Sequence, residues 1–234
     1  LIYYLNNFLK LGSKIFFKGF CKLIKIIRRF LFLVSVLRVR SYRKMFFKKF
    51  DKNKPVMDLG ANKGQTAIIF WFRGVETYCI EPHPIIFKDL QDIFSDIKYI
   101  HTINAAVISE FEKDQEYIDL YIHKSQTSST KDLSQASSLM MDKVNINKEN
   151  SVKVKTVKFK NLIKEIPKFS ILKCDIEGYE YFLYKDILKF SKKFDLIILE
   201  THEKKNPQWL KKHQQLKLEF STNLDSSKYN LDWH

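Results

Sequence analysis

Short apolar runs alternate with helical segments along this 234-residue chain, and this alternation constrains its fold more than any other feature. Apolar runs at residues 55–60, 75–80 and 97–103 are separated by segments of helical character at 65–73 and 84–94. Continuously apolar strands joined by helices are typical of a mostly parallel sheet that is covered on both faces. The sequence therefore predicts an α/β fold.

The same pattern returns in the second half of the chain. Apolar runs at residues 169–174 and 194–199 flank a helix expected at 179–190. Residues 117–123 and 152–157 instead alternate apolar and polar side chains, as half-exposed strands do. The segment between these two strands, residues 124–150, is rich in Ser, Gln, Lys and Asn, and we expect a long loop there.

The first apolar run leads into the stretch MDLGANKGQT, residues 57–66, which holds two of the six glycines in the chain. Ligands of open α/β sheets bind at the carboxyl ends of the strands, and glycine lets a ligand approach without a Cβ in the way. The stretch has neither Gly-x-Gly-x-x-Gly nor Gly-Lys-Ser/Thr, so it matches neither the dinucleotide nor the P-loop signature. An aspartate at position 58 would instead accept a hydrogen bond from a ligand amine.

Glu81 ends the second apolar run, 23 residues after Asp58. A carboxylate at this place can accept both hydroxyls of a ribose. The helix that opens at Gly64 and Gln65 has free N–H groups that can bind a carboxylate. A ligand with an amine, a carboxylate and a free ribose is S-adenosylmethionine, so these residues predict a site for that cofactor.

Five elements occur in the order found in the FkbM-like family of S-adenosylmethionine-dependent methyltransferases, and the chain resembles that family. The elements are Asp58–Gly64, Glu81–Pro82, Asn104–Val107, Leu172–Glu180 and Leu199–Lys204. The resemblance implies a Rossmann-like class I methyltransferase fold, with a seven-stranded, mostly parallel sheet flanked by helices. It also implies O-methylation, with a hydroxyl of a sugar or surface glycan as the favoured acceptor.

Under this interpretation the cofactor is bound by residues at the first three strand ends. We expect contacts from Asp58, Gly60, Ala61, Asn62, Gly64, Gln65, Thr66, Glu81, Asn104 and Ala105. Methyl transfer from a sulfonium needs an aligned acceptor and a base that takes its proton. Asp175, Glu177 and His202 follow two later strands at the same sheet edge and are the catalytic candidates.

Three further polar residues are expected at the acceptor, namely Ser138, Glu180 and Glu200. For Glu180 the alternative is a carboxylate that simply stabilises the first turn of a helix. Asp175 and Glu177 would also suit Mg²⁺ without requiring it. The sequence leaves a divalent metal open and does not favour one.

Residues 1–50 carry 13 of the 41 Lys and Arg residues and no acid, whereas the rest of the chain carries 28 bases and 26 acids. The bases recur every three or four residues, so we expect a basic helical extension before a methyltransferase domain at 51–234. Either its apolar side packs on the domain, or it lies on an anionic lipid surface. The nearly neutral body argues against a nucleic-acid groove.

Three unpaired cysteines, Cys21, Cys79 and Cys174, favour a reducing compartment and no zinc site. The apolar run at residues 30–37 is far shorter than the roughly 20 residues that span a bilayer. We therefore expect a cytoplasmic protein, held peripherally on the inner face of the membrane if the extension binds lipid. The alternative functions are an RNA or protein methyltransferase that grips an acidic partner, and a non-catalytic membrane-associated scaffold with this fold.

Overall fold

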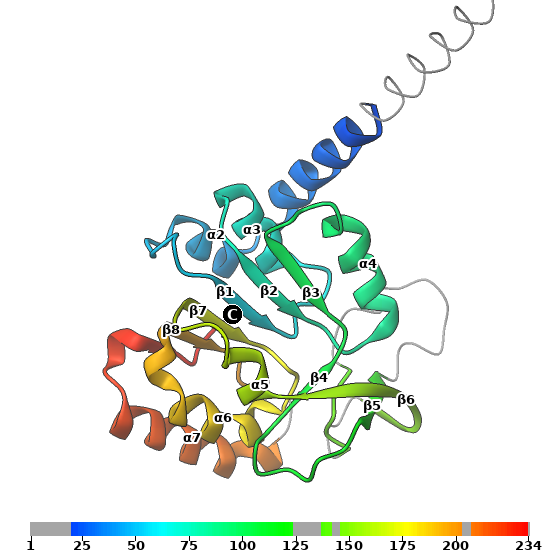
Figure 1. Cartoon of the computed structure of the whole chain (residues 1–234). Coiled ribbons are helices and arrows are strands. Elements are labelled where there is room, and N and C mark those ends of the chain that lie inside the picture. The colour runs from blue at the N-terminus through cyan, green and yellow to red at the C-terminus, as the bar shows by residue number, and fades with distance from the viewer. Residues whose placement is uncertain (1–19, 124–136, 142–145, 203–206, 234) are drawn as a thin grey trace, which may run out of the picture.

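The structure is a computed structural model that describes residues 20–123, 137–141, 146–202 and 207–233 (Figure 1). Its centre is a six-stranded sheet in which each pair of neighbouring strands is parallel. In spatial order the strands are β3 (Ile100–Ile103), β2 (Thr77–Ile80), β1 (Val56–Leu59), β7 (Phe169–Cys174), β8 (Phe194–Leu199) and β9 (Tyr229–Asn230). Every residue of β1 and β7 is buried, as their apolar runs predict.

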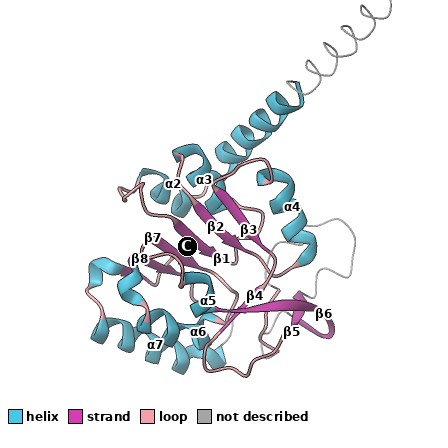
Figure 2. Cartoon of the chain, in the orientation of Figure 1, coloured by secondary structure: helices cyan, strands magenta, loops and turns pink. Residues whose placement is uncertain are grey.

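Helices cover both faces of this sheet (Figure 2). One face packs against α2 (Arg40–Phe47), α3 (Gln65–Arg73) and α4 (Pro84–Phe94). The other packs against α5 (Phe159–Ile163), α6 (Glu180–Lys189) and α7 (Leu210–Asn223). Short 3-10 helices lie at Ser191–Lys193, Pro207–Trp209 and Ser226–Lys228. The sheet is therefore the middle layer between two apolar cores, which leaves its edges for binding.

The predicted helices at 65–73 and 84–94 are confirmed at both ends. Local chemistry explains this accuracy. Gly64 and Gly74 adopt left-handed backbone angles on either side of α3, and Pro84 occupies the first turn of α4. The strand predicted at 97–103 is shorter and begins at Ile100.

The prediction of a seven-stranded sheet is wrong, because the central sheet has six strands. A separate sheet contains β4 (Ala106–Ile108), β6 (Ile146–Lys158) and β5 (Tyr117–His123), in that order. The alternating strands β5 and β6 pair antiparallel and keep one face toward water, so they do not suit a sheet that is buried on both sides. The predicted loop at 124–150 also ends too late, since β6 begins at Ile146; residues 124–136 and 142–145 lie outside the described residues.

The described part of the basic extension begins as a helix over residues 20–36, which projects from the rest of the molecule (Figure 1). Its base is held by the buried Arg29, whose Nε donates a hydrogen bond to the carbonyl oxygen of Ile93 at 2.8 Å and whose guanidinium pairs with Asp96. Leu33 and Val36 enter the core beside α3, so the end of this helix packs on the domain. Residues 1–19 lie outside the described part.

Beyond that base the projecting helix is exposed. Residues 20–28 are all exposed, and large apolar side chains line much of the helix: Phe20, Leu23, Ile24, Ile26, Ile27, Phe30, Leu31 and Val34. In the described ranges there is no helix with the length and apolar character needed to cross a membrane.

Candidate active site

The site lies where the strand order reverses. From β1 the chain builds outward through β2 and β3, whereas β7 returns to the other side of β1 and leads to β8. The loops after β1 and β7 therefore part at the carboxyl edge of the sheet, which is where open α/β sheets bind ligands. A pocket with an empty volume of about 660 Å³, including its open mouth, lies there.

Glu81, at the end of β2, forms one wall of this pocket. Its two carboxylate oxygens accept the backbone N–H groups of Asn62 and His83, at 2.9 and 2.8 Å. These bonds orient the side chain, and each oxygen keeps a lone pair for a ligand. Burial raises the pKa of Glu81 to about 7, which the two backbone hydrogen bonds only partly oppose. The arrangement suits a carboxylate that accepts neighbouring hydroxyls.

The two glycines of the first loop are required by the packing of the chain itself. Gly60 has a φ of +76°, and a Cβ there would lie 1.8 Å from the backbone oxygen of Asp175. Gly64 has a φ of +91°, and a Cβ there would lie 2.5 Å from the ring of Phe94. The close approach that we attributed to a ligand is thus made by neighbouring protein atoms. Gly60 nevertheless lines the pocket.

Asp58 lies beneath the pocket and has no exposed surface. It stands opposite Lys173 of β7 in the sheet, and the ammonium of Lys173 lies 3.4 Å from both the Asp58 and the Asp175 carboxylates. Burial raises the pKa of Asp58, and Lys173 only partly offsets this. Burial disfavours the charge on Lys173, but the two carboxylates outweigh it and raise its pKa. Lys173 thus links the end of β1 to the loop after β7 by charge.

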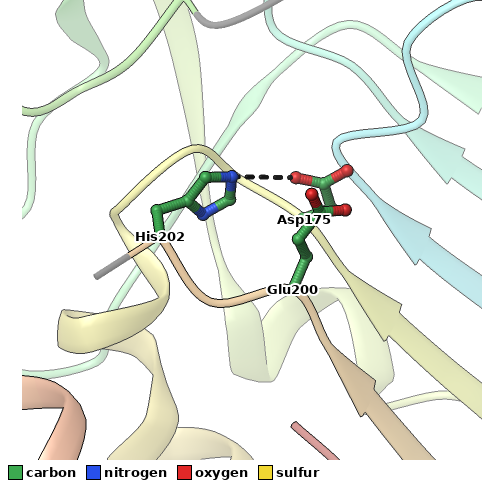
Figure 3. A group of neighbouring side chains, drawn as sticks. All are labelled: Asp175, Glu200 and His202. Carbon is green, nitrogen blue, oxygen red and sulfur yellow. Dashed lines mark ion pairs between the residues drawn. The ribbon is translucent and has the colours of Figure 1, made fainter. Parts of the chain in front are cut away.

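The candidate catalytic groups meet at the ends of β7 and β8 (Figure 3). Asp175 follows β7, whereas Glu200 and His202 follow β8. One ligand atom from each of these three side chains lies within 4.8 Å of the other two. The imidazole Nε2 of His202 is 3.7 Å from Asp175 Oδ1 and 3.2 Å from Glu177 Oε2. Two strands that are adjacent in the sheet therefore bring together residues 25 or more positions apart in the chain.

Glu180 holds His202 from the other side. Its Oε1 lies 2.7 Å from His202 Nδ1, and its Oε2 accepts the backbone N–H of Gly178 at 2.8 Å. Glu180 has no exposed surface, and His202 is 1 % exposed. The side chain expected at the acceptor thus supports a catalytic candidate instead. Glu177 precedes this turn with a φ of +56°, a backbone angle that a residue with a Cβ adopts only under local constraint.

The charges in this cluster shift one another strongly. Burial works against a charged His202, but the carboxylates of Glu180, Glu177 and Asp175 outweigh it and raise the pKa to about 9. Burial and the neighbouring Asp175 raise the pKa of Glu200 to about 7. Burial opposes ionisation of Asp175 as well, yet Lys173 and His202 prevail and lower its pKa. At neutral pH the ligand-free cluster therefore holds an ionised Asp175 beside an imidazolium.

The pocket brings together six of the residues expected at the site, namely Gly60, Asn62, Glu81, Ala105, Asp175 and Glu177. The other expected residues lie in the described part of the chain but do not line the pocket: Asp58, Ala61, Gly64, Gln65, Thr66, Asn104, Ser138, Glu180, Glu200 and His202. Asn104, for example, donates its side-chain amide to the backbone oxygens of Glu81 and Pro82. Ser138 donates its hydroxyl to the backbone oxygen of Glu177 at 2.7 Å, while Ser137 lines the pocket. Direct ligand contacts of these residues remain predictions.

Sequence reasoning missed two polar residues at the site. Lys173 could have been noticed as a charged residue inside an otherwise apolar strand, where an unpaired lysine is rarely buried. His83 received no role, yet it lines the pocket and is 4 % exposed. Burial lowers the pKa of His83, so it is neutral at pH 7. Only its position directly after Glu81-Pro82 signalled a place at the pocket.

Comparison with known proteins agrees with the geometry. The sequence matches the methyltransferase FkbM domain over residues 58–226, which includes the loop after β1, Glu81 and the whole Asp175–His202 cluster. No curated protein matches the chain. The matched segment covers well over half of the 234 residues and contains each strand that forms the pocket, apart from the first two residues of β1. The chain therefore belongs to the FkbM methyltransferase family.

Proposed function

We propose that this protein is an S-adenosylmethionine-dependent O-methyltransferase that acts on a hydroxyl of a sugar or glycan. The observation that carries the proposal is one pocket lined by both Glu81 and Asp175, since these carboxylates belong to opposite halves of the sheet. A cofactor whose ribose binds at Glu81 extends toward the acceptor side, where Asp175 and Glu177 lie. When bound, S-adenosylmethionine supplies a methyl group on a sulfonium, which is already electrophilic.

The residues present fit such a cofactor. Glu81 offers an oriented, buried carboxylate for the ribose hydroxyls. Apolar side chains of the same pocket, including Ile80, Ile86 and Leu139, provide a surface for the flat adenine ring. Asp58 is buried beside the loop after β1, where its Oδ1 pairs with Lys173 at 3.4 Å. Neither oxygen accepts a hydrogen bond among the described residues, so the carboxylate can still accept one from the methionine amine.

We assign the removal of the proton from the acceptor hydroxyl to the pair Asp175 and Glu200. A base is most effective when its pKa lies near the working pH, and the pKa of Glu200 is about 7. Asp175 lines the pocket and connects Glu200 to it. His202, with a pKa of about 9, is protonated in the ligand-free protein and stabilises the carboxylates rather than acting as the base.

A sugar is favoured over a charged polymer because, among the described residues, the pocket is lined by the carboxylates of Glu81, Asp175 and Glu177 and by no lysine or arginine. Carboxylates accept hydrogen bonds from hydroxyls, whereas they repel phosphate. The test is incubation of the purified protein with labelled S-adenosylmethionine and a panel of sugars, glycans, RNA and proteins. Transfer to a sugar hydroxyl supports the proposal. Transfer only to RNA or protein favours the alternative enzyme, and absence of both cofactor binding and transfer favours the non-catalytic scaffold.

We further propose that the projecting helix binds an anionic lipid surface, which would hold the enzyme beside lipid-linked acceptors. The support is its exposed apolar set at residues 20–34 together with three exposed bases, Lys22, Lys25 and Arg28, and no acid. Interfacial helices combine apolar side chains that enter the acyl boundary with bases that attract anionic headgroups. A large apolar surface of this kind is rare on a helix that faces only water.

A further inference from the structure

The cluster of Asp175, Glu200 and His202 has the composition of a metal site. One atom from each side chain lies within 4.8 Å of the others. The ligands of one cation lie about 3 to 4.4 Å apart, since metal–ligand distances are about 2.1 Å. His202 Nε2 and Asp175 Oδ1, which are 3.7 Å apart and directed toward each other (Figure 3), already have this spacing. The Glu200 carboxylate would have to approach by roughly 1 Å to complete the set.

The orientation of His202 is a second, independent observation. Its Nδ1 is engaged by Glu180 at 2.7 Å, so its Nε2 faces Asp175 and Glu177. Within the described residues this buried Nε2 forms ion pairs with Glu177 and Asp175 but makes no hydrogen bond, and Asp175 Oδ1 likewise accepts none. A carboxylate that holds one imidazole nitrogen while the other is directed at a cluster of acids is the arrangement in which proteins present histidine to metals.

The negative charge of the cluster also favours a bound cation. Among the described residues, five carboxylates, on Asp58, Asp175, Glu177, Glu180 and Glu200, lie around one lysine and one histidine, Lys173 and His202. All seven side chains are buried or half-buried. Excess negative charge is costly where water is excluded, and a divalent cation would offset it.

We propose that Asp175, Glu200 and His202 bind one divalent cation. Two carboxylate oxygens and one imidazole nitrogen form a mixed ligand set. Such a set suits Mn²⁺, whereas Ca²⁺ prefers sites made of oxygen ligands alone. Three protein ligands leave coordination positions open on the side of Asp175 that faces the pocket. Under the proposed function, an acceptor hydroxyl would occupy one of these positions, Asp175 and Glu200 would hold the cation, and the proton of the hydroxyl would pass to Glu177, the other carboxylate at this end of the pocket.

The decisive experiment uses the full chain with MnCl₂ alone, without cofactor or acceptor, after treatment with a chelator. Isothermal titration calorimetry should find one Mn²⁺ site per chain. Pulsed electron paramagnetic resonance of the bound Mn²⁺ should show modulation from a coordinated nitrogen. Because neither measurement involves methyl transfer, failure of this inference and failure of the proposed function are distinguishable.

Variants assign the ligands. Glu200→Gln should weaken Mn²⁺ binding by at least about tenfold, and His202→Asn should remove the nitrogen modulation. Glu180→Gln, which changes the residue behind the imidazole, should weaken binding by about 10- to 100-fold. Asp89→Asn, an exposed acid on α4, is the matched control and should leave binding unchanged. Wild-type protein that binds no Mn²⁺, or bound Mn²⁺ without nitrogen modulation, would overturn the proposal even if a variant failed to fold.

Discussion

The imidazole Nδ1 of His202 lies 2.7 Å from the carboxylate of Glu180, and both side chains are almost completely buried. Glu180 begins α6 and His202 follows β8, so this contact ties the helix start to the end of the neighbouring strand. The same carboxylate also accepts the N–H of Gly178. One buried acid thereby fixes the turn that carries Glu177 and the imidazole that faces Asp175.

Glu180→Ala should destabilise the protein by about 3 to 5 kcal/mol, because removal of one partner leaves a buried charge and a buried N–H group unpaired. Urea unfolding at pH 7 measures the change. Glu219→Ala is the control, since Glu219 is a half-buried acid of α7 that bonds Tyr184 and Gln215; its effect should stay within about 1 to 2 kcal/mol. Equal effects of the two variants would contradict the supporting role of Glu180.

Glu81→Ala should weaken the binding of S-adenosylhomocysteine by about 100-fold, since two hydrogen bonds from ribose hydroxyls to a charged group are lost. Calorimetry measures the affinity. Glu76→Ala removes an exposed acid just before β2, at the far end of that strand, and should change nothing. Cofactor binding that survives in Glu81→Ala would argue against the assignment of the ribose to this wall of the pocket.

The stability of the ligand-free protein should depend on pH through Glu81. Its pKa rises from 4.5 to about 7 on folding, so the folded chain binds this proton more tightly than the unfolded chain. Its favourable contribution is complete below about pH 4.5 and is lost as the pH rises through 7. Relative to Glu81→Ala, the free energy of unfolding of the wild type should fall by about 3 kcal/mol between pH 4.5 and pH 8.

Urea unfolding of both proteins across this pH range tests the effect. Parallel curves for wild type and variant would show that Glu81 has an ordinary pKa. Because an ionised carboxylate accepts hydrogen bonds more strongly than a protonated one, the affinity for S-adenosylhomocysteine should rise over the interval from pH 6 to pH 8.

Asp175→Asn should reduce methyl transfer by about 100-fold or more, because the carboxylate at the pocket is lost, whether it takes the proton or holds the acceptor. Cofactor affinity should stay near that of the wild type, since Glu81 and the first loop are untouched. Single-turnover assays with labelled donor and separate cofactor titrations distinguish the two effects. Full activity in Asp175→Asn would move the base to another residue.

Replacement of Leu23, Ile27 and Leu31 by serine should reduce binding to phosphatidylserine-containing liposomes by more than about tenfold, because each apolar side chain contributes roughly 1.5 to 3 kcal/mol when buried. These positions are exposed, so the fold should be retained. The matched control is Phe111→Ser, an exposed apolar residue of the domain. Liposome flotation measures binding, and a wild-type chain that never floats would exclude the lipid surface.

Local elements were largely predictable. The bounds of α3 and α4 follow from glycine and proline at their ends, and the strands β5, β7 and β8 match their predicted ranges. The strand count was not predictable, because pairing of β5 with β6 in a second sheet depends on contacts between segments far apart in the chain. The same holds for Lys173, whose charge is acceptable only because Asp58 stands opposite it in the sheet.

The sequence by itself determined the alternation of strands and helices, and with it that Asp58, Glu81, Asp175 and His202 end strands at one edge of a sheet. Periodicity and turn residues are local properties, so they can be read without the fold. Only the tertiary structure decided which side chains meet. Glu180 supports His202, and Glu200 joins Asp175, because β7 and β8 are neighbours and α6 starts beside them. Distances between buried charges set their pKa values, and those distances exist only once the sheet has formed.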